Sequence, residues 1–367
     1  MTMKFSASRD TILRPLQAVI GVVERRQTMP ILGNVLLVAQ ENRLGITATD
    51  LEVELLAETE MEVETPGDIT IPGRKLHDIC KALPEGATIE FEKSGDRVTV
   101  KASRSRFTLS SLRAADFPTV EEITAQQTLT IERQAFKNLL DKTHFSMAQQ
   151  DVRYYLNGLL FETDGTTLRA VATDGHRLAI SEIQLANAAE RKEQVIVPRK
   201  GVLELQRLLD GEGDFDLTLG ANHVRAQLDG IRFTSKLIDG RFPEYERVMP
   251  REVQNIISAD RGLLSQALQR AAILSNEKYR GVRLDLAENS LTIQANNPEQ
   301  EEAEETLEVD YGGTVMEIGF NVNYLLDALS AVDEDQVQLG LGDANSSCLV
   351  KGPTTENTKF VVMPMRL

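Results

Sequence analysis

Cysteine is scarce in this chain of 367 residues: only Cys80 and Cys348 occur, and they do not form a CxxC spacing. Two cysteines so far apart in the sequence indicate neither a disulfide framework nor the thiolate cage of a structural zinc site. We therefore expect both to be small, buried, apolar side chains, and we expect no metal site and no cofactor.

Long apolar runs are also missing. No window of the sequence approaches the roughly 18 apolar residues that a membrane helix requires, and the first residues lack the basic, apolar and small-residue segments of a signal peptide. We expect a cytoplasmic protein that has no membrane partner. An apolar content of 41% over this length predicts two or three domains of ordinary size.

Known catalytic motifs are absent: no Walker A, GxSxG, HExxH or Rossmann glycine pattern occurs. Asp174 and His176 follow a predicted strand two residues apart, a spacing that could suggest an acid and a base. The same Ala-Thr-Asp turn recurs at Asp50 without a histidine, so the aspartate more simply shapes the turn. The histidines without partners at metal-ligand spacing are His77, His144 and His223. We expect a protein that is not an enzyme.

Positive charge is in deficit, with a net charge of −16 and a pI near 4.9. Phosphate binding requires a positive surface, so the composition argues against a protein coated with DNA-binding residues. Any nucleic-acid function must gather its cations locally.

What the sequence does contain is a threefold repeat. In each copy a strand runs into an amphipathic helix, and these stretches are 3–23, 129–147 and 256–274. A second helix is predicted within 71–83, 197–209 and 319–329. The turns after the first strand pair contain Ala48, Ala172 and Ala295, which lie 124 and 123 residues apart. The closing strands carry Phe107, Phe233 and Phe360. The repeat predicts an α+β protein of three similar domains, at 1–126, 127–251 and 252–367.

The repeats also show where the positive charge lies. Five of the six predicted helices with their flanks hold 17 Lys or Arg against 7 Asp or Glu, at 9–26, 72–81, 132–142, 199–207 and 261–280. Any amphipathic helix has a charged solvated face, which would explain one such helix. Five of six favour a cationic surface inside an acidic protein. No helix-turn-helix, zinc finger, basic zipper or RNP motif occurs, so DNA binding without sequence readout is favoured.

A family resemblance extends over nearly the whole chain. The stretches that carry it are MPILGN at 29–34, SRSRFTLSSL at 103–112, AADFP at 114–118, QDVRYYLNG at 150–158, VATDGHRLA at 171–179, VPRKG at 197–201, FTSKLIDGRFP at 233–243, AAILSNEKYRGVRL at 271–284, ANNPEQEEAEE at 295–305 and the final VVMPMRL. By these stretches the chain resembles the bacterial DNA polymerase III beta subunit, the beta sliding clamp. The resemblance implies a non-catalytic processivity factor of the DNA polymerase III holoenzyme that acts in DNA replication.

The resemblance implies a head-to-tail homodimer, a six-domain ring with helices lining the central hole and sheets outside. It places the first domain against the third domain of a second copy. A small apolar contact flanked by complementary charges would be strong and still openable. The residues implied at this interface are Arg104, Arg106, Phe107, Leu109, Ile273, Leu274, Glu301 and Glu304, with Glu302 and Glu305 in the same acidic run.

The resemblance also implies DNA contacts at Arg26, Arg74, Gln150, Tyr154 and Tyr155. Arginines hold phosphates, while the glutamine amide and the tyrosines hydrogen-bond the DNA backbone or stack on an exposed base. Core packing is the alternative explanation for the two tyrosines.

A groove between the second and third domains is implied as the site for short linear peptides. Its matching residues are Leu156, Thr173, Gly175, His176, Arg177, Leu178, Pro243, Arg247, Val248, Val361, Val362, Met363, Pro364, Met365 and Arg366. The tail VVMPMRL is unusual in itself, because it is apolar almost to its end and contains two methionines, which adapt to ligands of different shape. A final core strand is the alternative, and it explains the valines better than it explains Met363, Pro364 and Met365.

The partners implied by the resemblance are double-stranded DNA, held topologically and without sequence specificity, and a second copy of the chain. Further implied partners are the DNA polymerase III alpha subunit, the clamp loader delta subunit, and other polymerases, ligase and mismatch-repair proteins with linear clamp-binding motifs. The implied location is the nucleoid and replisome. From the residues alone, a repeat scaffold that binds only proteins and an enzyme with an unrecognised site stay open.

Overall fold

The computed structural model describes residues 3–23, 29–120, 123–250 and 253–366. The chain divides into two compact units. The first comprises Met1–Gln134 and Lys200–Leu237, and the second comprises Ala135–Arg199 and Ile238–Leu367. None of the helices in the described ranges is long and apolar enough to cross a membrane.

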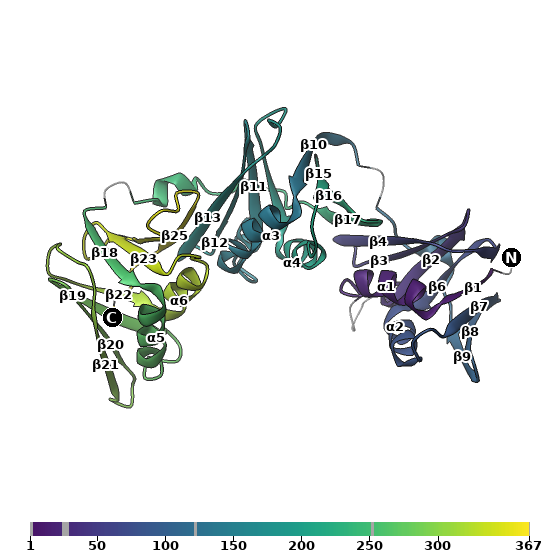
Figure 1. Ribbon diagram of the computed structural model, residues 1–367, viewed down its shortest axis with the longest axis horizontal. Helices are drawn as coiled ribbons and strands as arrows, with labels where there is room; N and C mark the ends of the chain where they lie inside the picture. The colour runs from purple at the N-terminus through teal and green to yellow at the C-terminus, as the bar shows by residue number, and fades with distance from the viewer. Residues whose placement is uncertain (1–2, 24–28, 121–122, 251–252, 367) are drawn as a thin grey trace. The chain divides into compact units, whose positions relative to one another are not determined.

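Two antiparallel sheets form the first unit (Figure 1). The smaller sheet has the strand order β5-β1-β7-β8-β9, with bounds Val63–Thr65, Lys4–Ser8, Thr88–Ser94, Arg97–Ala102 and Ser105–Ser110. The larger has the order β10-β15-β16-β17-β4-β3-β2-β6, with bounds Ala125–Glu132, Asp214–Gly220, His223–Leu228, Ile231–Lys236, Val53–Glu60, Arg43–Thr49, Asn34–Gln40 and Gly67–Pro72.

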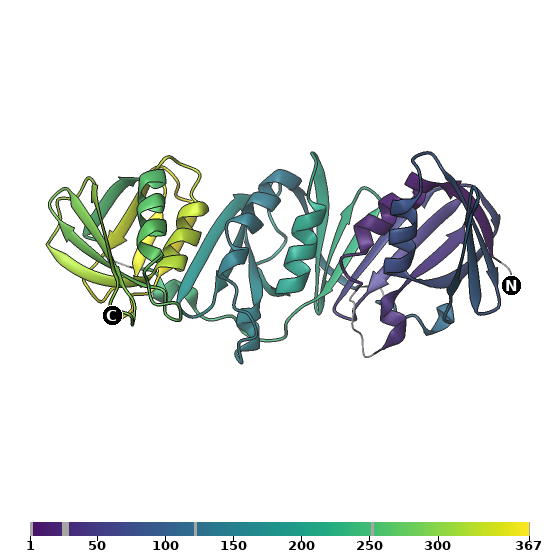
Figure 2. The same cartoon turned by 90° about the horizontal axis from the view of Figure 1, so that it is seen from below.

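The helices of the first unit are α1 (Arg9–Val19), α2 (Gly73–Ala82) and nearly all of α4 (Arg199–Leu208). Helix α1 begins after Ser8, whose Oγ accepts the N–H of Thr11 at 3.2 Å and satisfies a helix-terminal donor. Its apolar stripe is buried against β3 and β4, and α2 packs beside it (Figure 2, purple and blue helices). The short 3₁₀ helices are η1 (Pro30–Gly33) and η2 (Ala114–Asp116).

The second unit also has two antiparallel sheets. The larger has the order β14-β11-β12-β13-β25-β24-β23-β18, with bounds Glu193–Pro198, Gly158–Asp164, Thr167–Thr173, Arg177–Gln184, Thr358–Val362, Cys348–Lys351, Gln336–Leu341 and Asn255–Asp260. The smaller has the order β21-β20-β19-β22, with bounds Glu302–Glu308, Ser290–Asn296, Gly281–Ala287 and Met316–Asn321.

The helices α5 (Arg261–Ala272) and α6 (Val322–Ser330) lie side by side in the second unit and contact strands of both sheets (Figure 2, green and yellow). Each has a side-chain N-cap, Asp260 for α5 and Asn321 for α6. Most of α3 (Arg133–Asp141) also belongs here, with η3 (His144–Ser146), η4 (Tyr154–Asn157) and η5 (Tyr245–Val248).

Strand register aligns the three repeats. Ala48 pairs with Leu55, Ala172 pairs with Ala179, and Ala295 pairs with Ala303. The strands β4, β13 and β21 are therefore equivalent. By their matched phenylalanines, so are β9, β17 and β25. This agreement confirms the threefold repeat and the α+β class.

The compact units cut through the middle repeat. Strand β17 pairs with β4 of the first repeat, and β13 pairs with β25 of the third, so each half of the middle repeat continues a neighbouring sheet. The boundaries near 126 and 251 do not coincide with the unit limits and stay predictions; residue 251 lies outside the described ranges.

Both cysteines are buried, as predicted. Burial raises the pKa of the Cys80 and Cys348 thiols to about 12, so both stay protonated at neutral pH. Across the described ranges, no three His, Cys, Asp or Glu side chains are placed to hold a metal ion.

Candidate functional site

The floor of the predicted peptide pocket lies on one face of β13 and β25. Leu178 is opposite Val361 in the ladder, and both belong to a buried apolar cluster. Because side chains alternate along a strand, Arg177 and Val362 point to the other face, where Val362 joins the core of the third repeat. The other buried members of the floor cluster are Leu160, Val171, Ile196, Phe242 and Tyr245.

Arg177 is engaged inside the fold. Its Nε donates to the Asp174 carboxylate at 3.1 Å, and its terminal nitrogens donate to Asp327 of α6 and to the Phe145 carbonyl oxygen. The guanidinium carbon also lies 4.5 Å from the centroid of the Tyr324 ring. Although Arg177 was predicted to line the pocket, these contacts join β13 to α6 on the opposite face.

The tail that follows β25 is held by its backbone. The N–H of Met363 donates to the His176 carbonyl oxygen, and the N–H of Met365 donates to the Gly319 carbonyl oxygen, both at 2.9 Å. The Met363 residue is nevertheless 37% exposed, and Pro364 and Met365 are half-buried. Fixed backbone with accessible apolar side chains suits a binding surface better than it suits a core strand.

The turn between β12 and β13 shapes one side of the predicted pocket. Thr173 Oγ1 accepts the N–H of Gly175 at 3.1 Å, and Asp174 Oδ1 accepts the N–H of His176 at 2.9 Å. The equivalent turn in the first repeat is built in the same way around Asp50. Asp174 is therefore a turn-forming residue, as predicted, and not half of a catalytic pair.

The remaining predicted pocket residues all belong to the second unit. Leu156 is buried in η4, while Pro243, Arg247, Val248 and Arg366 are exposed. The first three of these exposed residues lie in or next to η5, which Tyr245 anchors in the floor cluster. The structure thus brings an apolar floor, an adaptable tail and a 3₁₀ helix into one unit.

The predicted DNA contacts divide by exposure. Tyr154 is 57% exposed, whereas Tyr155 is half-buried and packs against the floor cluster; the two rings meet edge to face at 5.7 Å. Gln150 is exposed. Arg74 is half-buried and donates to the Val23 carbonyl oxygen. Arg26 lies outside the described residues.

The predicted interface residues lie on two sheet edges. Strand β9 ends the smaller sheet of the first unit, where Phe107 and Leu109 are half-buried and Arg104 and Arg106 are exposed. Strand β21 ends the smaller sheet of the second unit. The residues predicted beside it are Ile273, which is 75% exposed, half-buried Leu274, and the exposed Glu301, Glu302 and Glu304. Glu305 is half-buried and is already held by Arg270 at 2.7 Å within the same chain.

Comparison with known proteins identifies the family. The three domains of the DNA polymerase III beta subunit match the chain in order: the N-terminal domain at 3–121, the central domain at 130–244 and the C-terminal domain at 246–366. The chain belongs to the DNA polymerase III beta subunit family. Membership confirms the resemblance, the three clamp domains and the assignment to a non-catalytic subunit.

The relatives match this chain over its full length. The beta sliding clamps of Pseudomonas putida and Escherichia coli are 55% and 50% identical to this chain over 367 residues, which is 100% of each protein. The crystal structure of the DNA polymerase III subunit beta from Pseudomonas aeruginosa is 53% identical, covers 100% of both chains and has a TM-score of 0.97. The structure of that clamp bound to griselimycin also covers 100% of both chains, with a TM-score of 0.96.

Nothing in the sequence indicated the contacts that hold the segment between the predicted DNA contacts Gln150 and Tyr154. Arg153 donates to both carboxylate oxygens of Asp151, at 3.0 and 2.8 Å, and the Asn157 side chain accepts the Asp151 N–H. The Arg153 hydrogen bonds lower the pKa of Asp151 to about 2. These hydrogen bonds surround Val152, which is 95% exposed and lies between the predicted DNA contacts Gln150 and Tyr154. An Asp-x-Arg spacing is too common to have indicated it.

Fewer of the helix cations are free to bind DNA than the sequence count predicts. Arg207 of α4 donates to carbonyl oxygens at the end of α1, including that of Ala18, and Lys142 pairs with Asp333. Both contacts join neighbouring repeats. Exposed helix cations include Arg14, Lys75 and Lys81. Part of the cationic excess therefore fastens one repeat to the next.

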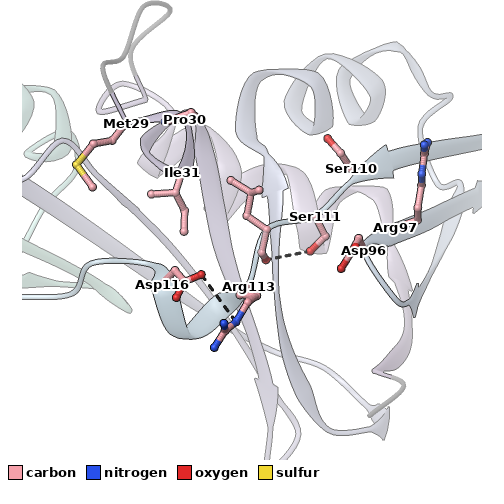
Figure 3. Close-up of a pocket in the computed structure, with 10 residues that line it drawn as sticks. Met29, Pro30, Ile31, Asp96, Arg97, Ser110, Ser111, Arg113 and Asp116 are labelled. Carbon is pink, nitrogen blue, oxygen red and sulfur yellow. Dashed lines mark hydrogen bonds and ion pairs between the residues drawn. The ribbon is translucent and has the colours of Figure 1, made fainter.

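A separate cavity has a volume of about 920 Å³ and lies in the first unit (Figure 3). Met29, Ile31 and Leu112 give it an apolar lining, and Arg113 pairs with Asp116 at 3.8 Å. It opens beside the end of β9, and none of the residues predicted to bind DNA, peptide or a second copy lines it.

Proposed function

We propose that this chain is a DNA sliding clamp: two copies close head to tail around duplex DNA and tether the replicative polymerase and other factors to it. The observation that carries the proposal is a junction that the chain makes twice between neighbouring repeats. One further pair of strand edges matches those that meet at the two junctions, and this pair can meet only between two copies of the chain.

The first junction pairs β17 of the middle repeat with β4 of the first repeat, with Phe233 opposite Leu55. The second pairs β25 of the third repeat with β13 of the middle repeat, with Phe360 opposite Ala179. In both, the closing strand of one repeat joins the same strand of the repeat before it. A rule obeyed at both internal junctions is expected at the next.

Strand β9 is equivalent to β17 and β25, and β21 is equivalent to β4 and β13. Each of β9 and β21 has a ladder partner on one side only among the described strands. Because Ala303 is equivalent to Leu55 and Ala179, the rule places Phe107 of one copy opposite Ala303 of the other. One position along, Arg106 then faces Glu304. Phe107 and Ala303 are both half-buried and Arg106 and Glu304 are both exposed, so the register matches face to face.

A contact between different ends of two identical chains is heterologous, and it forms a ring when the rotation closes. The ring would hold DNA by enclosure, which is compatible with the net charge of −16. Arg74, Gln150, Tyr154, Tyr155 and Arg26 are proposed to touch the DNA backbone or an exposed base without reading sequence. We place the protein at the replisome on the cytoplasmic nucleoid.

The pocket around Leu178, Val361 and Met363 is proposed to receive linear clamp-binding peptides. Its exposed methionine adapts to different ligands, which suits one site that serves several partners. The proposed partners are the DNA polymerase III alpha subunit, the clamp loader delta subunit, and other polymerases, ligase and mismatch-repair proteins.

A loading experiment tests enclosure against adhesion. The protein is loaded on a nicked circular plasmid with a clamp loader and ATP, then washed in high salt before the plasmid is linearised. We expect retention on the circle and release after linearisation, because salt weakens ion pairs but does not open a topological link. Loss from the circle in high salt, or retention on linear DNA, would contradict the clamp and favour a protein-binding scaffold.

A further inference from the structure

The face of β13 and β25 that forms the pocket floor continues beyond it. Two residues along the ladder from the Leu178–Val361 pair, Ile180 is opposite Lys359. Two residues further, the N–H of Glu182 donates to the Asn357 carbonyl oxygen at 2.8 Å. A cavity of about 200 Å³ is lined by Ile180, Lys359, Glu182 and Asn357 of this stretch, and its volume is about that of one side chain.

The cavity shares its apolar surface with the proposed peptide pocket. Ile180 and Met249 line the cavity, and both pack against the same buried cluster that contains Leu178 and Val361. Tyr245 belongs to that cluster and also lines the cavity. A peptide held over the pocket floor therefore reaches the cavity by extending along the same face.

Carboxylates outnumber the cations around this cavity. Three glutamates line it, Glu182, Glu246 and Glu356, against Arg169 and Lys359. The guanidinium of Arg169 is fully engaged: it donates to Glu182 and to buried Glu162 at 2.6 Å, and to the Tyr245 hydroxyl at 2.9 Å. It contributes little free positive charge to the cavity.

The other lining cation is also shared. Glu356 lies 3.6 Å from Lys359 and 2.6 Å from Lys351. Exposed Glu246, on η5, has no ion-pair partner among the described residues. The lining of the cavity thus combines an apolar surface, formed by Ile180 and Met249, with the carboxylate of Glu246, which has no ion-pair partner among the described residues.

The geometry points to an extension subsite that takes one lysine or arginine side chain of a bound partner peptide. The aliphatic stem would lie on Ile180 and Met249, and the charged end would lie at Glu246, as long cationic side chains commonly combine apolar and polar surroundings. The inference rests on the proposed peptide pocket and adds a charge preference to it.

Fluorescence anisotropy tests this preference with the C-terminal tail peptide of a DNA polymerase III alpha subunit. The peptide is compared with versions extended at one end, and then at the other, by lysine, glutamate or alanine. At the end that reaches the cavity we expect the lysine version to bind about three- to fivefold more tightly than the alanine version, and the glutamate version more weakly. The Glu246→Gln variant should lose the lysine advantage.

The matched control is Glu288→Gln, which removes an exposed carboxylate in the turn between β19 and β20 and should keep the advantage. Equal affinity of the three extended peptides, or a lysine advantage that survives Glu246→Gln, overturns the subsite while the pocket stands. No binding of the unextended peptide to the native protein overturns the pocket itself, and the subsite with it.

Discussion

Single residues explain why the proposed peptide groove occurs at one junction and not at its counterpart. The positions equivalent to Leu178 and Val361 in the first junction are Glu54 and Thr234, by the register of the paired strands. Glu54 is 2% exposed, and burial raises its pKa. Its carboxylate accepts the N–H of Val120 at 2.8 Å, so the chain itself covers this position. A buried carboxylate satisfied in this way offers no apolar floor.

The same alternation limits what a resemblance predicts at this scale. A matched stretch such as VATDGHRLA names neighbouring residues together, but a strand sends Arg177 and Leu178 to opposite faces. The alternation itself was predictable from the sequence. The engagement of Arg177 by Asp327 was not, because it depends on how α6 packs.

Gly175 tests the turn beside the pocket. Its φ is +87°, and an added Cβ would lie 3.0 Å from the Arg153 guanidinium. We expect Gly175→Ala to lower the free energy of unfolding by about 1 kcal/mol, from the left-handed conformation, and to weaken binding of the alpha-subunit peptide several-fold. Denaturant unfolding and anisotropy measure the two effects.

Gly165→Ala is the matched control, because Gly165 has a φ of +58° with open space around its missing Cβ. It should cost similar stability and leave peptide affinity unchanged. Equal peptide affinity in both variants would assign Gly175 to the fold alone.

Among the secondary-structure elements, the sequence predicted the repeating order well. The stretches 71–83, 197–209 and 319–329 contain the start of each second helix, and the structure gives α2, α4 and α6 there. Periodicity sufficed because each helix has one buried stripe. The continuity of the sheets from one repeat to the next was not predictable, since a strand sequence does not say which edge it joins.

The tail is the element that tests the peptide pocket. Deleting 363–367 removes backbone hydrogen bonds to His176 and Gly319 and the side chains of 363–366, which are exposed or half-buried, but no member of the floor cluster. We expect alpha-subunit peptide affinity to fall more than tenfold while the dimer persists in sedimentation. A variant that lacks only residue 367, which is not among the predicted pocket residues, is the control. Unchanged peptide affinity after the longer deletion would refute the pocket.

In the whole molecule one junction is made twice within the chain, and we propose that it is made again between chains. The net charge of −16 and the engagement of helix cations such as Arg207 and Lys142 both favour holding DNA by enclosure over holding it by charge. The sequence predicted the partners of this junction by resemblance. The register between β9 and β21 could be inferred only from the strand pairs of the structure. The turn of the third repeat is one residue longer, and it shifts Ala303 by one residue relative to its counterparts.

The register predicts which charges meet across the ring. Arg106→Glu or Glu304→Arg alone would place like charges opposite one another, at a cost of about 1 kcal/mol in each of two interfaces, or roughly 30-fold in the dimer dissociation constant. The two reversals combined should restore most of the affinity in sedimentation equilibrium. Glu288→Arg, which is exposed in a turn away from the edge, controls for net charge. If the double reversal dimerises no better than the single ones, Arg106 does not face Glu304, and the junction between chains differs from the two within them.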